Sequence, residues 1–72
     1  MSSLPGRALS GVVASFDAEA GLGEILDDSG RHWPFHCIEI ADGSRQIAAG
    51  TPVRFTATAR LGRYEASGVA GR

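Results

Sequence analysis

The chain has 72 residues, a net charge of −1 and one cysteine. This length predicts a single small domain without room for a buried enzyme pocket, so we expect no enzyme activity. The charge is unlike that of a strongly basic nucleic-acid binder, and one cysteine excludes an intramolecular disulfide framework. No apolar run is long enough to span a membrane and the N-terminal residues lack an apolar signal core, so we expect a cytoplasmic protein.

Short strands follow a loose lead-in at residues 1–8. We expect them at residues 9–16, 23–26, 31–40, 51–58 and 64–69, with a connection at 41–50 that has room for one helical turn, and a frayed end at 71–72. The clearest turn signal is Asp27-Asp28-Ser29-Gly30, four turn-forming residues between apolar runs. Pro34 lies inside the third strand, where a residue without an N–H donor favours an edge or a bulge.

Five short strands separated by regular turns predict an all-β fold, a small five-stranded β-barrel at residues 9–70. Closure of the sheet would remove the exposed edges that promote aggregation. The residues that we expect to point into the core are Val13, Phe16, Ile25, Trp33, Phe35, Val53, Phe55, Ala66 and Val69.

Five segments resemble the cold-shock domain family. They are Gly11-x-Val13-x-x-Phe16 followed by Gly21-x-Gly23-x-Ile25, Trp33-Pro34-Phe35-His36-Cys37, Gly50-x-x-Val53-x-Phe55, and Ala66-x-x-Val69. The second and third of these glycine-rich and aromatic motifs are similar to the two ribonucleoprotein motifs of that family. The resemblance implies an OB-type barrel and a family whose members bind single-stranded RNA and DNA.

The departures from the family pattern fall on its binding face. Leu22 and Glu24 replace the two Phe residues of the first motif, and Pro34 and Cys37 replace those of the second. The first-strand Trp and the Lys before the glycines are also absent, which leaves His36 as the family binding residue that remains. Each lost ring removes about 1–3 kcal/mol of base stacking, so the family's usual binding mode cannot persist intact.

The first function that we expect is therefore weak, mostly electrostatic contact with single-stranded RNA or DNA. The candidate binding residues are His36, Arg54, Arg60, Arg63 and Tyr64. The alternative is a protein-interaction or self-association module on the same scaffold, with Leu22, Glu24, Pro34 and Cys37 as its patch. The same residues also have an interpretation without a binding function: the arginines form surface ion pairs with Glu65 or Asp42, and Tyr64 lies at the rim of the barrel.

Two further pairs of residues resemble chemical sites, but we expect neither a metal site nor a catalytic pair. His32 and His36 are four residues apart on one expected strand, about 13 Å, which is too far to share a metal, and no cofactor is expected. Neighbouring His36 and Cys37 point to opposite faces, which argues against a nucleophilic pair. We also expect Glu24 and His36 to pair across neighbouring strands, because the two ribonucleoprotein motifs lie side by side in the family fold.

Overall fold

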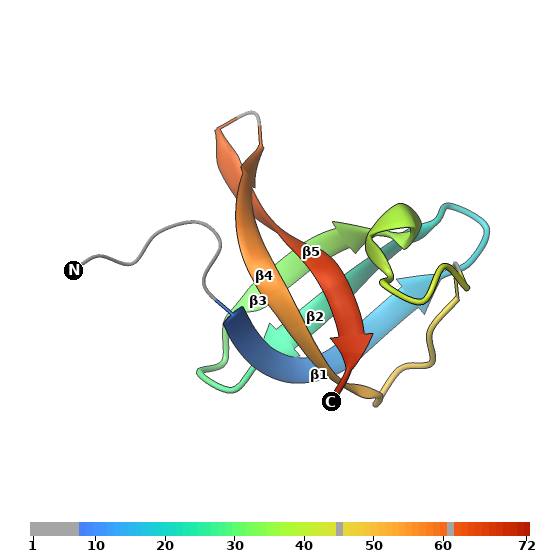
Figure 1. Ribbon diagram of the computed structural model, residues 1–72, viewed down its shortest axis with the longest axis horizontal. Coiled ribbons are helices and arrows are strands. Elements are labelled where there is room, and N and C mark those ends of the chain that lie inside the picture. Colours follow the sequence, from blue (N-terminus) through green and yellow to red (C-terminus); the bar gives the residue numbers. More distant parts are fainter. Residues whose placement is uncertain (1–7, 45, 61) are drawn as a thin grey trace.

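Five antiparallel strands form one sheet in the computed structural model (Figure 1). The structure describes residues 8–44, 46–60 and 62–72, and only the backbone of Arg60 and Arg63. The elements are β1 (Ala8–Asp17), β2 (Leu22–Asp27), β3 (His32–His36), the 3₁₀ helix η1 (Cys37–Glu39), β4 (Pro52–Arg60) and β5 (Arg63–Gly71). Their order in the sheet is β3-β2-β1-β4-β5, so β3 and β5 are its two edges.

The two edges approach each other without joining into a ladder. An isolated parallel bridge links Ile40 to Val69, and the Ala41 N–H donates to the Val69 carbonyl at 2.7 Å. Strand pairing between β3 and β5 themselves is absent from the described residues. The prediction of an all-β fold with five strands is confirmed, whereas the sheet is not closed by hydrogen bonds into the barrel that we expected.

The strand boundaries differ most from expectation after His36. The third strand was expected to continue to Ile40, but the chain turns into η1 at Cys37, whose N–H donates to the Gly21 carbonyl at 2.8 Å. The helical turn therefore precedes the 41–50 connection. At the other hairpin, β4 and β5 are longer than expected and pair from Arg60 and Arg63 down to Val53 and Gly71.

Two β-bulges explain why apolar residues three apart can both face the core. Residues i and i+3 of a regular strand point to opposite faces. The pairing of β1 with β2 shifts between Val13 and Ser15, and that of β4 with β5 shifts between Arg54 and Thr56. The second shift places Gly68, at φ 58°, in the left-handed region that glycine tolerates, and Val69 beyond it is fully buried.

The core contains eight of the nine residues that we expected, and Ile40 and Ala57 join them. Phe16 was the exception, because it is only partly buried at the rim of the core. Its ring stacks on Phe35 at a centroid distance of 5.9 Å, so it still extends the apolar packing. The shift in the β1 pairing lies just before Phe16 and changes where its side chain falls.

The end of the chain is tied to the sheet in this structure. Gly71 is the last residue of β5, and the Arg72 N–H donates to the Pro52 carbonyl at 3.0 Å. These are the two residues that we expected to fray. Ala8 begins β1, and the rest of the expected lead-in lies outside the described residues. None of the helical structure in the described ranges is long and apolar enough to cross a membrane.

Candidate functional site

The face formed by β2 and β3 carries Leu22, Glu24 and Pro34 at positions where the cold-shock resemblance would place aromatic side chains. Leu22 lies opposite His36 and is 46% exposed, and Glu24 lies opposite Pro34. The aromatic residues of these strands, Trp33 and Phe35, both point into the core. The rings that this face does expose are the imidazoles of His32 and His36, and it exposes neither Trp33 nor Phe35.

Packing accounts for both glycines of the first motif. Gly21 has φ 70°, and a Cβ there would lie 3.0 Å from the Cys37 sulfur. A Cβ on Gly23 would lie 2.5 Å from the Phe35 ring and 2.8 Å from the Phe16 ring. The glycines thus let η1 and the Phe16–Phe35 stack approach β2, so they need no ligand to explain them.

Glu24 pairs with His32, and the predicted pairing with His36 is wrong. The Glu24 Oε1 lies 2.9 Å from the His32 Nδ1, and both side chains remain about half exposed. The register places Glu24 opposite Pro34, and two positions along β3 the side chain of His32 points to the same face. His36 lies two positions away in the other direction, opposite Leu22.

The other predicted binding residues do not form one cluster. His36 is exposed at the end of β3, and Cys37 is partly buried in η1. Arg54 is exposed on β4 opposite Ser10 of β1, six positions from Arg60 along the strand, about 20 Å away. The side chains of Arg60 and Arg63 lie outside the described residues.

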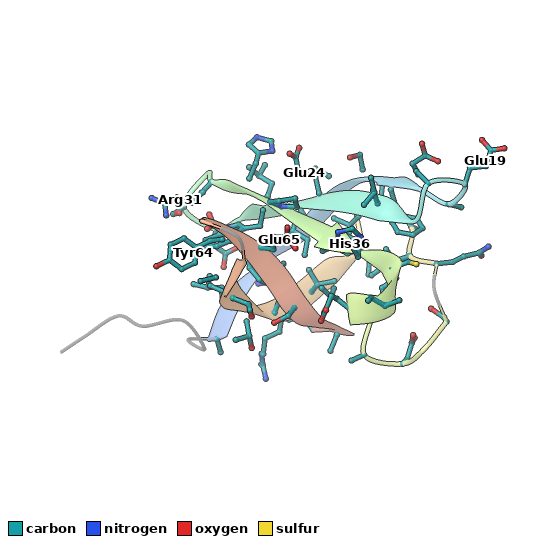
Figure 2. The ribbon with its side chains drawn as sticks, turned by 90° about the horizontal axis from the view of Figure 1, so that it is seen from above. Glu19, Glu24, Arg31, His36, Tyr64 and Glu65 are labelled. Atoms are coloured by element: carbon teal, nitrogen blue, oxygen red, sulfur yellow. The ribbon has the colours of Figure 1, made fainter. Side chains whose placement is uncertain are left out.

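Tyr64 belongs to a cluster at one end of the sheet that the sequence did not reveal. Its ring is 53% exposed and meets the Trp33 ring edge-on, at a centroid distance of 6.4 Å and an angle of 70°. The Arg31 guanidinium carbon lies 5.9 Å from the Trp33 ring centroid. Figure 2 shows Arg31 and Tyr64 together at this end, and Glu19 at the opposite one. We call Arg31, Trp33 and Tyr64 the Trp33 cluster.

A signal for Arg31 was present in the sequence. Arg31 and Trp33 are two residues apart at the start of a strand, a spacing that puts both side chains on one face. Tyr64 could not be added from spacing, because it reaches Trp33 only through the approach of the β5 edge to β3.

Asp27 holds the cluster in place from within. Its Oδ1 accepts hydrogen bonds from the Ser29 N–H at 2.8 Å, the Ser29 hydroxyl at 2.7 Å and the Arg31 N–H at 2.9 Å. Its Oδ2 accepts one from the Trp33 Nε1 at 2.8 Å. Burial by itself would raise the pKa of Asp27, but these hydrogen bonds outweigh burial and lower the pKa well below its ordinary value. Asp27 is therefore a charged structural residue, and it lies at the turn that the sequence predicted.

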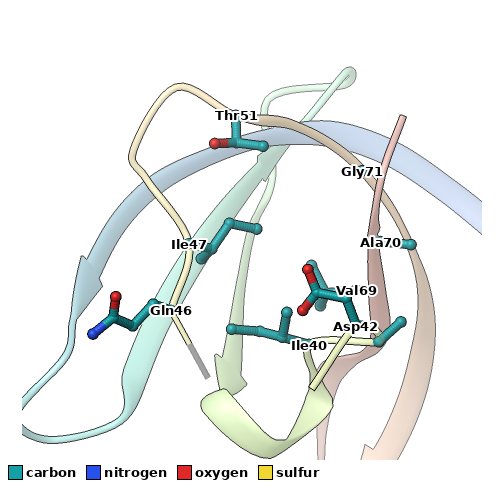
Figure 3. A pocket seen from close by; sticks show the side chains of 9 residues that line it. Ile40, Asp42, Gln46, Ile47, Thr51, Val69, Ala70 and Gly71 are labelled. Atoms are coloured by element: carbon teal, nitrogen blue, oxygen red, sulfur yellow. The ribbon is translucent and has the colours of Figure 1, made fainter. Parts of the chain in front are cut away.

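A pocket of about 360 Å³ lies between the connection after η1 and the end of β5 (Figure 3). Ile40, Ile47 and Val69 supply its apolar walls, and Asp42 and Gln46 also line it. Asp42 accepts a hydrogen bond from the Ser44 N–H at 2.8 Å, which lowers the pKa of its carboxyl group. This arrangement has no paired acid and base, so we assign no chemistry to it.

The described residues contain no group of three or more His, Cys, Asp or Glu side chains that could hold a metal ion. In comparisons with known proteins, no family model matches the chain, and no curated protein matches it significantly.

Proposed function

We propose that the protein is a divergent cold-shock-like domain that binds single-stranded RNA or DNA weakly on an OB-type barrel. The strand order supports the barrel, because an OB-fold is a five-stranded, partly open barrel. An isolated bridge between Ile40, just beyond η1, and Val69 of β5 supports the same architecture, because it links the chain that follows the β3 edge to the β5 edge.

The exposed ring of Tyr64 is the observation that carries the binding function. A base can stack on a ring that is 53% exposed, and such a contact is worth about 1–3 kcal/mol. Arg63 precedes Tyr64 directly, and Arg60 pairs with Arg63 across the hairpin, so two cationic residues belong to the same strand ends. Backbone phosphates are the usual partners of such arginines.

The affinity should be low because the β2–β3 face contributes little. One stacked base falls well short of the roughly 8 kcal/mol that a micromolar complex needs. Glu24 stands in the middle of that face, hydrogen-bonded to His32, and an acid at this position repels phosphate. Binding therefore depends mainly on charge and shape.

A titration with mixed-sequence single-stranded RNA and DNA at low salt, followed residue by residue by NMR, tests this function. We expect fast-exchange shifts at Tyr64 and its neighbours in β5. A double-stranded DNA of the same sequence is the control and should shift these signals less. The absence of any shift with either single strand would overturn the proposal.

A protein-interaction or self-association module is the second candidate, and two exposed apolar residues favour it. Leu22 on β2 is 46% exposed, and Ile38 on η1 is 68% exposed. In this case the NMR signals of Leu22 and Pro34 should shift as the protein concentration rises, without any nucleic acid. Analytical ultracentrifugation of the same samples should then show a mass above that of the monomer, whereas a monomer at every concentration would argue against self-association.

A further inference from the structure

We propose that Arg31 is a phosphate-binding residue, and that the single strand lies across the Trp33 cluster with a base on Tyr64 and a phosphate on Arg31. This inference rests on the proposed function and adds a contact residue to it. It also moves the binding surface from the β2–β3 face to the end of the sheet where the edges of β3 and β5 meet.

The Asp27 carboxylate accepts hydrogen bonds from both the backbone of Arg31 and the side chain of Trp33. The Arg31 N–H donates to Asp27 Oδ1 at 2.9 Å, and the Trp33 Nε1 donates to Asp27 Oδ2 at 2.8 Å. The backbone of Arg31 and the ring beneath its guanidinium are thus fixed relative to each other. A planar guanidinium that lies on an aromatic ring keeps its N–H donors in the plane available to a phosphate, and holding it there reduces the ordering that binding requires.

The Arg31 guanidinium has no carboxylate partner among the described residues. Arg72 differs, because its guanidinium lies 3.5 Å from the Asp28 carboxylate. Asp27 is buried and its carboxylate is occupied by its four hydrogen bonds, so it stabilises the turn without pairing with the Arg31 side chain. An arginine that is stacked but not ion-paired can bind a phosphate without first breaking a salt bridge.

The neighbourhood of the cluster suits a polyanion with exposed bases. Tyr64 and Arg31 both lie against the Trp33 ring. The Tyr64 ring centroid is 6.4 Å from the Trp33 ring centroid, and the Arg31 Cζ is 5.9 Å from it. Asp17 ends β1 and Glu19 lies in the turn after it, and Figure 2 shows Glu19 on the opposite side of the molecule from Arg31 and Tyr64. Of the acids nearer the Trp33 cluster, Asp27 is buried and occupied by its hydrogen bonds, and Asp28 is paired with Arg72.

Trp33 provides the probe, because it is the only Trp in the chain. We would titrate the protein with oligothymidylate of about 8 nucleotides, within the usual site size of an OB-fold, and follow Trp33 fluorescence. We expect Arg31→Gln to weaken binding about tenfold and to reduce the slope of log K against log salt by about 0.7, the value for one phosphate on a single strand.

Arg54→Gln is the comparison variant, because the sequence predicted Arg54 as a binding residue and the structure places it outside the Trp33 cluster. Arg54 is also an exposed arginine on a strand, and its replacement changes the net charge equally. We expect it to weaken binding by less than about twofold, the effect of a distant charge. Arg31→Lys keeps the charge but loses the planar guanidinium, so we expect it to lie between wild type and Arg31→Gln.

The outcomes separate the two proposals. If the wild type binds neither RNA nor DNA by fluorescence or NMR, the proposed function fails and this inference fails with it. If the wild type binds but Arg31→Gln and Arg54→Gln weaken binding equally, the function stands and the role of Arg31 is overturned. If Arg31→Lys binds as tightly as wild type, the stacked guanidinium does not contribute to affinity, and this part of the proposal is overturned. Should Arg31→Gln not fold, Arg31→Lys and Arg54→Lys compare the loss of the guanidinium at the two positions with the charge kept, and equal affinities of these two variants would overturn the role of Arg31.

Discussion

The carboxylate of Asp27 and the indole of Trp33 are joined by a hydrogen bond of 2.8 Å that ties the β2–β3 turn to the core. Asp27→Ala would leave the buried Trp33 Nε1 and the N–H groups of Ser29 and Arg31 without this acceptor. We expect a loss of about 2–4 kcal/mol in the free energy of unfolding, measured by urea denaturation. Asp28→Ala is the control. It removes only the exposed ion pair with Arg72 and should change stability by less than about 0.5 kcal/mol.

The same carboxylate should make the fold sensitive to acid. Hydrogen bonds lower the folded pKa of Asp27 from its ordinary value of 3.8, so its contribution to stability is present above that pH and is lost as the pH falls toward the folded pKa. The free energy of unfolding of the wild type should therefore fall steeply below about pH 4. Asp27→Asn should show a flatter profile there, measured by urea denaturation at each pH. Parallel profiles for the two proteins would contradict this role of Asp27.

Gly23 should tolerate no side chain. In Gly23→Ala the new Cβ would lie 2.5 Å from the Phe35 ring and 2.8 Å from the Phe16 ring, and we expect overpacking to cost about 1–3 kcal/mol in thermal or urea unfolding. Gly71→Ala is the matched control. Gly71 is also in a strand, but a Cβ there has no neighbour within 4 Å, so its stability should change by less than about 0.5 kcal/mol.

The Glu24–His32 pair should contribute a small, salt-dependent coupling. A double-mutant cycle with Glu24→Gln and His32→Gln, measured at about pH 5 where imidazoles are generally protonated, should give about 0.2–1 kcal/mol. Both side chains are about half exposed, so the coupling should shrink in high salt. The same cycle with His36→Gln in place of His32→Gln should give no coupling, and an equal value in both cycles would contradict the observed pairing.

Returning aromatic residues to the β2–β3 face should strengthen binding. Leu22→Phe with Glu24→Phe adds two stacking surfaces and removes an acid, so we expect at least about a tenfold gain in affinity for single strands, measured by fluorescence titration. Glu24→Gln alone removes the charge without adding a ring and should gain less. A folded double variant that binds no better would mean that this face is not accessible to a single strand.

The sequence by itself determined the strands and nearly the whole core. The alternation of Val53 and Phe55 and the turn at Asp27 are local signals, set by side-chain period and backbone preference, and they are legible without a structure. The two glycine-rich and aromatic segments that we expected side by side are neighbours, because β2 pairs with β3. Asp27 was correctly identified as a turn-former, although its hydrogen bond to Trp33 was not foreseen.

Only the tertiary structure decided which side chains meet. Register in a sheet depends on pairing between distant segments, and here it puts Pro34 opposite Glu24, with His32 and His36 each two positions away along β3. Only the tertiary structure shows that the Glu24 side chain meets His32. The Trp33 cluster depends on the same kind of information. Tyr64 is 31 positions from Trp33 in the chain and reaches it only because the two edges of one sheet approach each other. Local sequence fixes the period of each strand, whereas contacts between edges arise from the twist and bulges of the whole sheet.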